Sequence, residues 1–478
     1  MNVPFQIILN KQTTEFHPSS ENINFVRSHA NCAIMKTILV LGAGFSSRSL
    51  IDYLLQNAVE SNWKILVGDI NQARADAAIG NHPAGKAVKF DVHNDHDLKT
   101  YIAKADLVVS MLPARFHPLV AAHCLTEKAN LLTASYLSPE MRQMDKQARE
   151  RDILFINELG LDPGIDHMSA IRILQHIREN GGTPVSFKSY TGGLIAPESD
   201  NNPWNYKFTW NPRNVVLAGQ GCASFIENSQ IRYIPYQQLF KRTQLTEISG
   251  AGTFEVYPNR NSLIYRTIYN LPDIPTLIRG TLRRPGFCEA WDVFVQLGMT
   301  DDSCHLEGSE NLTARKFINT FLPGPENEPV QSKLSRQLNL QPEGAVMKKL
   351  AWLGLFDEEP VGLPNATPAQ ILQKILTGKW MFQPEDKDMI VMQHLIEYQD
   401  SHGKHEWRSS LVVTGKDQVH TAMAITVGSP LAIAASLLLN GSIRATGVRI
   451  PNTPDLYLPI LNKLEQLGIK FTEEIIDL

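Results

Sequence analysis

The chain has 478 residues, of which 43% are hydrophobic and 20% are charged, and this length predicts two or three domains rather than one core. Its 45 basic and 49 acidic residues give a formal net charge of −4, which offers no electrostatic case for nucleic acid or an anionic membrane as a partner. Five widely spaced cysteines without a C-x-x-C pair favour a reducing, cytoplasmic location and argue against a structural metal site.

The first 34 residues contain scattered prolines and serines and show no helical periodicity. They lack the patterns of a signal peptide and of a transit peptide. A second methionine, Met35, stands directly before the first apolar run. We therefore expect residues 1–34 to be an unstructured extension or a non-native start, with the functional protein beginning at Met35.

Residues 37–69 have the order strand, glycine-containing turn, helix, strand. In such a unit Gly42 would form the tight turn, Gly44 would let the backbone approach a pyrophosphate, and Ser47 would be the small residue where helix and strand pack. Asp69 ends the second strand, where a carboxylate accepts hydrogen bonds from ribose hydroxyls and repels a 2′-phosphate. The segment predicts a dinucleotide site that prefers NAD over NADP, although two glycines between apolar runs often form only a tight turn.

Further short apolar runs alternate with helix-period segments along the next part of the chain, which is typical of a parallel sheet covered on both faces. The strands expected there are 87–91, 107–111, 130–133 and 153–156. This alternation predicts a doubly wound Rossmann domain over residues 35–157.

The character of the chain changes after residue 157, because residues 158–167 combine turn formers with several ionisable side chains. We expect a functional loop there, then an α+β substrate-binding domain with a mixed sheet over residues 158–419. Its expected elements are a helix at 168–179, short strands and loops to about 297, a helical insertion at about 325–383, and a hairpin of 389–398 with 406–414. The apolar segment 421–440 is predicted to be a buried helix rather than a membrane span, and residues 420–478 are expected to complete the first domain.

Several short motifs follow one another along the chain. They are Leu41-Gly-Ala-Gly-Phe45, Ser110-Met-Leu-Pro113, Thr133-Ala-Ser-Tyr136, Glu158-Leu-Gly-Leu-Asp-Pro-Gly164, Ser189-Tyr-Thr-Gly-Gly-Leu194, Tyr206-Lys-Phe-Thr-Trp210, Tyr257-Pro-Asn-Arg260 and Arg279-Gly-Thr-Leu-Arg283. With these motifs the chain resembles the glutamate-forming saccharopine dehydrogenases, also called saccharopine reductases. The resemblance implies nicotinamide-dependent, reversible oxidation of L-saccharopine to L-glutamate and 2-aminoadipate 6-semialdehyde, a reaction of lysine metabolism.

The resemblance also implies roles for individual residues. Implied cofactor contacts are Gly42, Gly44, Phe45, Ser46, Asp69, Leu112, Ala134, Ser135, Leu161, Asp162, Pro163 and Trp210. Implied substrate contacts are Ser135, Tyr136, Arg260, Thr281, Leu282 and Arg283. Asp162 and Tyr136 are the implied catalytic residues, and no metal is implied. One departure is Thr191, which occupies a position where relatives often have cysteine, so no thiol is available there as an acid or base.

The chemistry of these side chains is consistent with those roles, and each also has an ordinary structural explanation. Arginine forks bind carboxylates bidentately, so Arg260 and Arg283 suit a tricarboxylate substrate, whereas most loop arginines are simply exposed. Asp162 could take a proton from an amine or from water, or could only shape a turn. His167 and Lys207 stay outside the main prediction, the first as a helix-start residue and the second as an exposed lysine.

Two other functions remain open at the level of sequence. A related enzyme could oxidise another secondary amine, such as a carboxylated polyamine or an opine. A non-catalytic NAD-binding regulatory protein would also fit the missing cysteine. A homodimer is the default expectation for the assembly.

Overall fold

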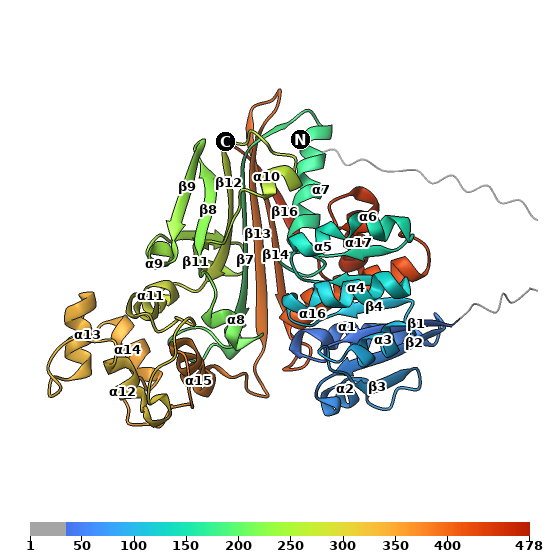
Figure 1. Cartoon of the computed structure of the whole chain (residues 1–478). Helices are drawn as coiled ribbons and strands as arrows, with labels where there is room; N and C mark the ends of the chain where they lie inside the picture. The colour runs from blue at the N-terminus through green and yellow to red at the C-terminus, as the bar shows by residue number, and fades with distance from the viewer. Residues whose placement is uncertain (1–34) are drawn as a thin grey trace, which may run out of the picture. The chain divides into compact units, whose positions relative to one another are not determined.

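The computed structural model describes residues 35–478, and the extension expected at residues 1–34 lies outside the described residues. Two β-sheets form the body of this part of the chain (Figure 1). The first is entirely parallel, as predicted for the Rossmann domain, and the second is mixed, as predicted for the α+β substrate-binding domain.

The first sheet has the strand order β15-β6-β5-β4-β1-β2-β3. Its strands are β1 (Lys36–Leu41), β2 (Trp63–Asp69), β3 (Gly85–Lys89), β4 (Leu107–Ser110), β5 (Asn130–Thr133), β6 (Leu154–Ile156) and β15 (Gly447–Arg449). The central strands are apolar throughout, and residues 38–41 of β1 are fully buried. A strand that is buried on both faces requires such a continuous apolar run, which is why the sequence identified these strands.

Helices cover both faces of this sheet, so the predicted doubly wound Rossmann arrangement is confirmed. They are α1 (Arg48–Ala58), α2 (Gln72–Ile79), α3 (Asp95–Ile102), α4 (His117–Glu127), α5 (Pro139–Gln143), α6 (Asp145–Glu150), α16 (Ala422–Leu439) and α17 (Pro454–Gln466), with short 3-10 turns η1 (Phe45–Ser47) and η2 (Ala114–Phe116). One core contains side chains of α1, α16 and α17, and the other contains side chains of α3, α4 and α5.

The second sheet is ordered β10-β11-β12-β7-β13-β14-β16, and the hairpin of β8 and β9 joins it at β12. Its strands are β7 (Thr183–Ile195), β8 (Cys222–Glu227), β9 (Gln230–Pro235), β10 (Gln244–Ile248), β11 (Gly252–Pro258), β12 (Thr276–Arg283), β13 (Asp388–Gln399), β14 (Lys404–Thr414) and β16 (Thr472–Asp477). The predicted hairpin is therefore β13 with β14. Short helices α8 (Pro212–Val216), α9 (Tyr236–Leu239) and α10 (Tyr265–Ile268), and the 3-10 turn η3 (Pro197–Ser199), lie in the connections.

The end of the chain differs from the expectation that residues 420–478 complete the first domain. Strand β15 pairs with β6 in the first sheet, as expected. Strand β16, in contrast, pairs antiparallel with β14 in the second sheet. Five of the six residues of β16 are exposed, so its pattern shows no preference for either domain, and the unpaired edge of β14 determines its position.

The helical region begins earlier than the predicted insertion at 325–383. It consists of α11 (Phe287–Leu297), η4 (Ser309–Asn311), α12 (Ala314–Asn319), α13 (Val330–Leu338), α14 (Ala345–Trp352) and α15 (Pro368–Trp380). Residues 287–297 were expected to be strand or loop, and this was wrong. Eight of the eleven residues of α11 are buried, and the other three, Glu289, Asp292 and Gln296, form a narrow polar stripe at helical spacing that the prediction overlooked.

Two helices, α7 (Ile165–Glu179) and α16, pack against β13 of the second sheet, and α16 also packs against α1 of the first domain. Helix α16 is long and apolar enough to cross a membrane by length and composition alone, with a mean hydropathy of 1.9. In the structure 61% of that window is buried, and its side chains belong to the core that the two sheets share. It is the core helix predicted from the sequence.

Candidate active site

The first sheet reverses its strand order between β1 and β4, and ligands of such sheets bind where the order reverses, beyond the carboxyl ends of the strands. The turns after these strands carry most of the predicted cofactor residues. Gly42–Ser46 follow β1, Leu112 follows β4, and Ala134 and Ser135 follow β5. The fold therefore brings these residues to one edge of the sheet.

The turn after β1 has the geometry that the glycines predicted. Gly42 has a φ of +100°, and a Cβ there would lie 3.1 Å from the Met111 carbonyl oxygen, so only glycine is accommodated. A Cβ on Gly44 would meet no atom within 4 Å, which leaves open space in front of this backbone. Ser47 is buried, and its hydroxyl donates to the Gly44 carbonyl at 2.8 Å. A backbone turn of this kind before helix α1 fits a pyrophosphate.

Asp69 lies beside this turn at the end of β2. Its two carboxylate oxygens accept backbone N–H bonds from Ala43 and Asn71, each at 2.8 Å. A carboxylate has about four acceptor positions, so two remain for ribose hydroxyls. The charge of this carboxylate opposes a 2′-phosphate at the same place.

A buried histidine supports the strand ends beside Ala134 and Ser135. His117 Nε2 lies 2.8 Å from the Ser135 hydroxyl and 3.0 Å from that of Thr133, while Nδ1 lies 3.0 Å from the Ser110 hydroxyl. Burial lowers the pKa of His117 to about 4, so the ring is neutral at pH 7. His117 had no predicted role, and it stands at the start of α4, four positions after the motif that ends at Pro113.

Residues 158–167 form a compact turn before α7, as the density of turn formers predicted. Gly164 has a φ of +148°, and a Cβ there would lie 2.1 Å from the Gly160 carbonyl oxygen. The peptide bond between Asp162 and Pro163 is cis. This turn places the partly exposed Asp162 carboxylate 3.2 Å from the Tyr136 hydroxyl, which donates to it. The two predicted catalytic residues therefore meet, although they are 26 positions apart.

Arg279 of β12 connects this pair to the second sheet. Its Nη2 donates to Asp162 Oδ1 at 2.5 Å and to Asp166 Oδ2 at 2.6 Å, and its guanidinium lies 4.1 Å from the centre of the Tyr265 ring. Burial alone would lower the pKa of Arg279, but the Asp162 and Asp166 carboxylates raise it well above its ordinary value. Arg279 was part of a motif but had no predicted role, because its carboxylate partners lie 117 and 113 positions away in the sequence.

The environment of Tyr136 decides what its hydroxyl can do. Burial first, and then the negative charge of Asp162, raise the pKa of Tyr136 above its ordinary value. The phenol therefore stays protonated at neutral pH and acts as a hydrogen-bond donor. A raised pKa favours this donor role over a role as a base.

Behind Asp166 lies a second buried group of ionisable side chains. His167 is fully buried, with Nε2 2.8 Å from Glu158 Oε2 and Nδ1 2.8 Å from the Tyr269 hydroxyl. His167 therefore belongs to the support of the loop rather than to its surface. Within residues 35–478, no group of three or more His, Cys, Asp or Glu side chains has the arrangement of a metal site.

The predicted substrate residues after β11 and on β12 have different surroundings. Arg260 is exposed, and its guanidinium lies 5.5 Å from the centre of the Tyr136 ring. It therefore faces the pair formed by Tyr136 and Asp162. Thr281 and Arg283 share the strand face of Arg279, because side chains alternate along β12. Leu282 points the other way and is fully buried in the core, so its side chain is unavailable to a substrate.

Arg283 lies in an aromatic cage. Its guanidinium lies 5.3 Å from the centre of the Tyr206 ring and 5.9 Å from that of Tyr257. Its Nη1 donates to the Leu282 carbonyl at 2.8 Å, but among the described residues Nε has no hydrogen-bond partner, and neither has the Tyr206 hydroxyl. Buried polar atoms without partners are costly, and ligand atoms commonly satisfy them.

Three further residues can now be placed. Trp210 is partly buried and packs on the edge of the core that contains Tyr206. Thr191 of β7 pairs with Thr281, and within the described chain its buried hydroxyl has no partner. Lys207 was expected to be exposed, and this was wrong, since it is buried and forms an ion pair with Asp386 at 2.6 Å.

Comparison with known proteins gives matches over nearly the whole described chain. Residues 38–156 match the family model described as saccharopine dehydrogenase NADP binding domain, and residues 160–469 match the saccharopine dehydrogenase C-terminal domain. The saccharopine dehydrogenase [NADP(+), L-glutamate-forming] of Schizosaccharomyces pombe is 32% identical over 462 residues, covering 93% of this chain and 100% of that protein. Mitochondrial alpha-aminoadipic semialdehyde synthase of Bos taurus is 35% identical over 460 residues, and the chain spans 49% of its length.

A solved structure agrees with these matches. The apo form of histidine-tagged saccharopine dehydrogenase (L-Glu forming) from Saccharomyces cerevisiae superposes with a TM-score of 0.84 at 31% identity, covering 92% of this chain and 100% of that chain. Its likeness extends over both sheets and the helical region. The chain belongs to the saccharopine dehydrogenase family.

Proposed function

We propose that this chain catalyses the nicotinamide-dependent, reversible oxidation of L-saccharopine to L-glutamate and 2-aminoadipate 6-semialdehyde. The observation that carries the proposal is the Asp162 carboxylate, held between the Tyr136 hydroxyl and the Arg279 guanidinium beside the carboxyl ends of the first sheet. The full-length match to relatives named for this reaction supports it.

The residues of the first domain fit a dinucleotide. The turn of Gly42 and Gly44 would hold the pyrophosphate, Asp69 the adenosine ribose, and the segment from Leu112 to Ser135 the nicotinamide end. A bound nicotinamide accepts the hydride that the substrate carbon loses. His117 fixes the Ser135 hydroxyl through its ring nitrogen.

The second sheet supplies positive charge for the three carboxylates of saccharopine. Arg260 reaches the site from the surface, and Arg283 presents an unpartnered Nε from within its aromatic cage. A guanidinium binds a carboxylate through two parallel hydrogen bonds and remains charged. These contacts would orient the carbon that is oxidised.

Asp162 is the group we assign to the reacting nitrogen. As the C–H bond breaks and hydride leaves, the nitrogen lone pair forms a C=N bond, so positive charge develops beside Asp162. The Arg279 guanidinium holds this carboxylate beside the nitrogen, and a carboxylate in that position stabilises the developing charge. Water then adds to the carbon, and the C–N bond breaks to give glutamate and the aldehyde, with Asp162 placed to take a proton from water.

Adding saccharopine and NAD or NADP to the purified chain should increase absorbance at the reduced-nicotinamide band. Asp162→Asn should lower kcat by about 100-fold or more, because general acid–base groups contribute roughly 10²–10⁴. Asp292→Asn is a matched control, since Asp292 is similarly buried but lies on α11, and its kcat should be unchanged.

The outcomes separate the alternatives. No absorbance change with saccharopine, but a change with a carboxylated polyamine or an opine, would replace the substrate. Cofactor binding without turnover of any of these amines would identify a regulatory protein. The homodimer and the cytoplasmic location stay predictions, and light scattering of the purified chain tests the first.

A further inference from the structure

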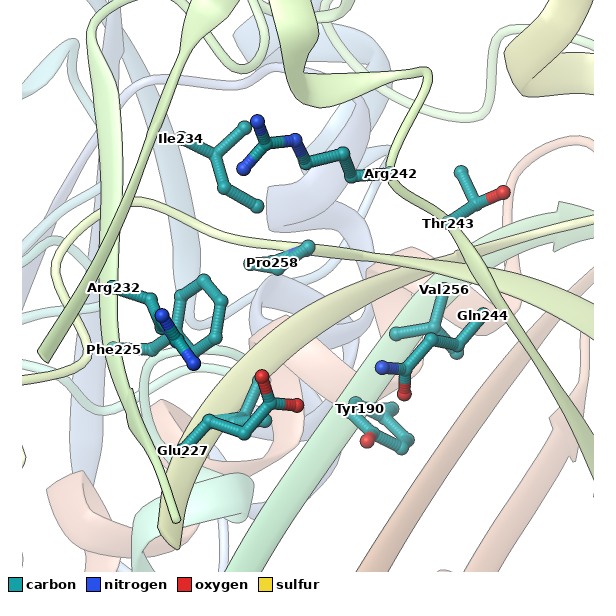
Figure 2. Close-up of a pocket in the computed structure, with 11 residues that line it drawn as sticks. Tyr190, Phe225, Glu227, Arg232, Ile234, Arg242, Thr243, Gln244, Val256 and Pro258 are labelled. Atoms are coloured by element: carbon teal, nitrogen blue, oxygen red, sulfur yellow. The ribbon is translucent and has the colours of Figure 1, made fainter. Parts of the chain in front are cut away.

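A cavity of about 330 Å³ lies in the second sheet, where β8 and β11 diverge from the same edge of β12 (Figure 2). Strand β12 pairs with β8 only at Leu277 and with β11 from Gly280 onward, which leaves a wedge between them. The volume is at the lower end of that of small-molecule sites, which are roughly 300–1,000 Å³.

The cavity has an apolar floor and a charged rim. Its buried floor consists of Phe225, Ile234, Val256, Ile278 and the ring of Tyr190. Its charged lining residues are Arg232, Arg242 and Glu227. Two guanidinium groups and one carboxylate give this lining a net charge of +1 at pH 7.

These charged groups are not used by the protein itself. Within residues 35–478, the side chains of Arg232, Arg242 and Glu227 form no hydrogen bond or ion pair, although all three face one cavity. Arg232 and Glu227 are diagonal neighbours on one face of the hairpin, since Phe225 pairs with Arg232 and Glu227 with Gln230. Figure 2 shows these two side chains at one end of the cavity and Arg242 at the other.

The cavity is separate from the candidate active site, because the two lie on opposite faces of β12. Ile278 points into the cavity, and its neighbour Arg279 points to Asp162 and Asp166. Consecutive side chains of a strand point to opposite faces. A ligand of the cavity would therefore not touch Asp162.

The arrangement defines the class of ligand. A carboxylate and an ammonium attached to one carbon atom would pair with Arg232 and Glu227, respectively, because these two residues are neighbours. A short apolar chain would lie over the floor, and a second carboxylate at its end would match Arg242. The resulting ligand has a charge of −1, which is opposite to the lining. We propose that this cavity is a second binding site, which takes an acidic α-amino acid with a side chain of two or three methylene groups.

Isothermal titration calorimetry of the full chain with L-2-aminoadipate tests the proposal. Arg232 and Arg242 are exposed. We expect saturable binding at millimolar or lower probe concentration, weakened about two- to fivefold by Arg232→Ala or Arg242→Ala, since an exposed charge pair contributes up to about 1 kcal/mol. Glu227→Gln should weaken the same probe. Glutarate lacks the ammonium, so Glu227→Gln should not weaken its binding and should strengthen it by removing a repulsive charge.

Two control variants separate this site from the active site and from general charge effects. Arg260→Ala removes a predicted substrate contact and should leave binding of L-2-aminoadipate unchanged. Arg444→Ala removes an exposed arginine of the first domain and should also have no effect. The proposal is rejected if wild type shows no saturable binding, if Arg232→Ala and Arg242→Ala bind normally, or if Arg260→Ala abolishes the signal.

Discussion

At the residue scale, the Arg279 guanidinium forms ion pairs with two carboxylates that differ in burial. Arg279 binds the fully buried Asp166 and the partly exposed Asp162. Asp166 also accepts the Gly164 N–H at 2.7 Å, so it fixes the loop, whereas Asp162 keeps a face toward solvent. An ion pair of this kind needs additional hydrogen bonds to offset desolvation, and here it holds the reactive carboxylate in one position.

Substitution of either predicted substrate arginine should lower kcat/KM for saccharopine. Arg260→Ala should lower kcat/KM for saccharopine at least about tenfold, because a charged contact to a carboxylate is lost while its exposure limits the effect. Arg283→Lys keeps a charge but cannot donate bidentately, so a similar loss is expected with the melting temperature preserved. Steady-state kinetics and NAD titration check both variants.

Arg284→Ala is the matched control for this pair. Arg284 is the next residue, but it donates to the Ala251 carbonyl and stacks on Phe254, away from the site. Its variant should keep normal saccharopine kinetics. Equal losses of NAD affinity in Arg260→Ala and Arg283→Lys would show that these arginines serve the cofactor or the fold.

Cofactor choice is also a property of one residue. We predict a higher kcat/KM with NAD than with NADP, because the Asp69 carboxylate opposes a 2′-phosphate, although the fungal relatives are named for NADP(+). Asp69→Ala should reduce the difference between kcat/KM with NAD and kcat/KM with NADP. Asp106→Ala is the control, because Asp106 accepts the Thr37 N–H at the opposite end of β1. This variant should keep the wild-type ratio of kcat/KM with NAD to kcat/KM with NADP. Better use of NADP by wild type would contradict the prediction.

At the scale of elements, strand β12 and helix α16 determine how the two domains meet. Alternation along β12 places Arg279, Thr281 and Arg283 on the face toward the site and leaves Leu282 in the core. Helix α16 packs on α1 at Gly428, where a Cβ would lie 2.8 Å from the Leu50 backbone nitrogen. The approach of the two helices therefore requires glycine.

Gly428→Ala should destabilise the protein by about 1–3 kcal/mol, because the helix must shift to admit the methyl group. Gly378→Ala in α15 is the matched control, since a Cβ there meets no atom within 4 Å. Its helix interior should gain about 0.5–1 kcal/mol from the better helix former. Denaturant unfolding of both variants measures the difference, and equal stability would contradict the close packing of α16 on α1.

At the scale of the whole molecule, buried histidines make stability depend on pH. Burial lowers the pKa of His117 to about 4 and that of His394 to about 3, both below the ordinary 6.5. Between these values the unfolded chain binds more protons, so the free energy of unfolding falls as pH falls below 6.5. Asp388 opposes this, because burial raises its pKa to about 6 and protonation then favours the folded state.

Summed over these three groups, stability should fall by about 2 kcal/mol between pH 7 and pH 5, at about 1.4 kcal/mol per pH unit for each group that titrates. His117→Gln keeps a hydrogen-bonding side chain without the titration and should show a clearly smaller fall. Urea unfolding at the two pH values checks this. A fall of the same size in His117→Gln would assign the acid sensitivity to other groups.

The sequence determined what depends on local pattern. Continuous apolar runs identified six of the seven strands of the first sheet, all except β15. The positive-φ requirement was visible in Gly42, where a tight turn follows β1. The density of turn formers in residues 158–167 predicted the compact turn that carries Asp162. These features act within a few residues of one another.

The tertiary structure decided everything that depends on residues far apart in the chain. Arg279 meets Asp162 across 117 positions, and Lys207 meets Asp386 across 179, so neither partner could be identified from local pattern. Strand β16 joined the second sheet because the edge of β14 was free. Helix α11 was overlooked although Glu289, Asp292 and Gln296 form a narrow polar stripe at helical spacing. Long-range pairing is set by which surfaces remain unsatisfied after local structure forms, and that information is distributed over the whole chain.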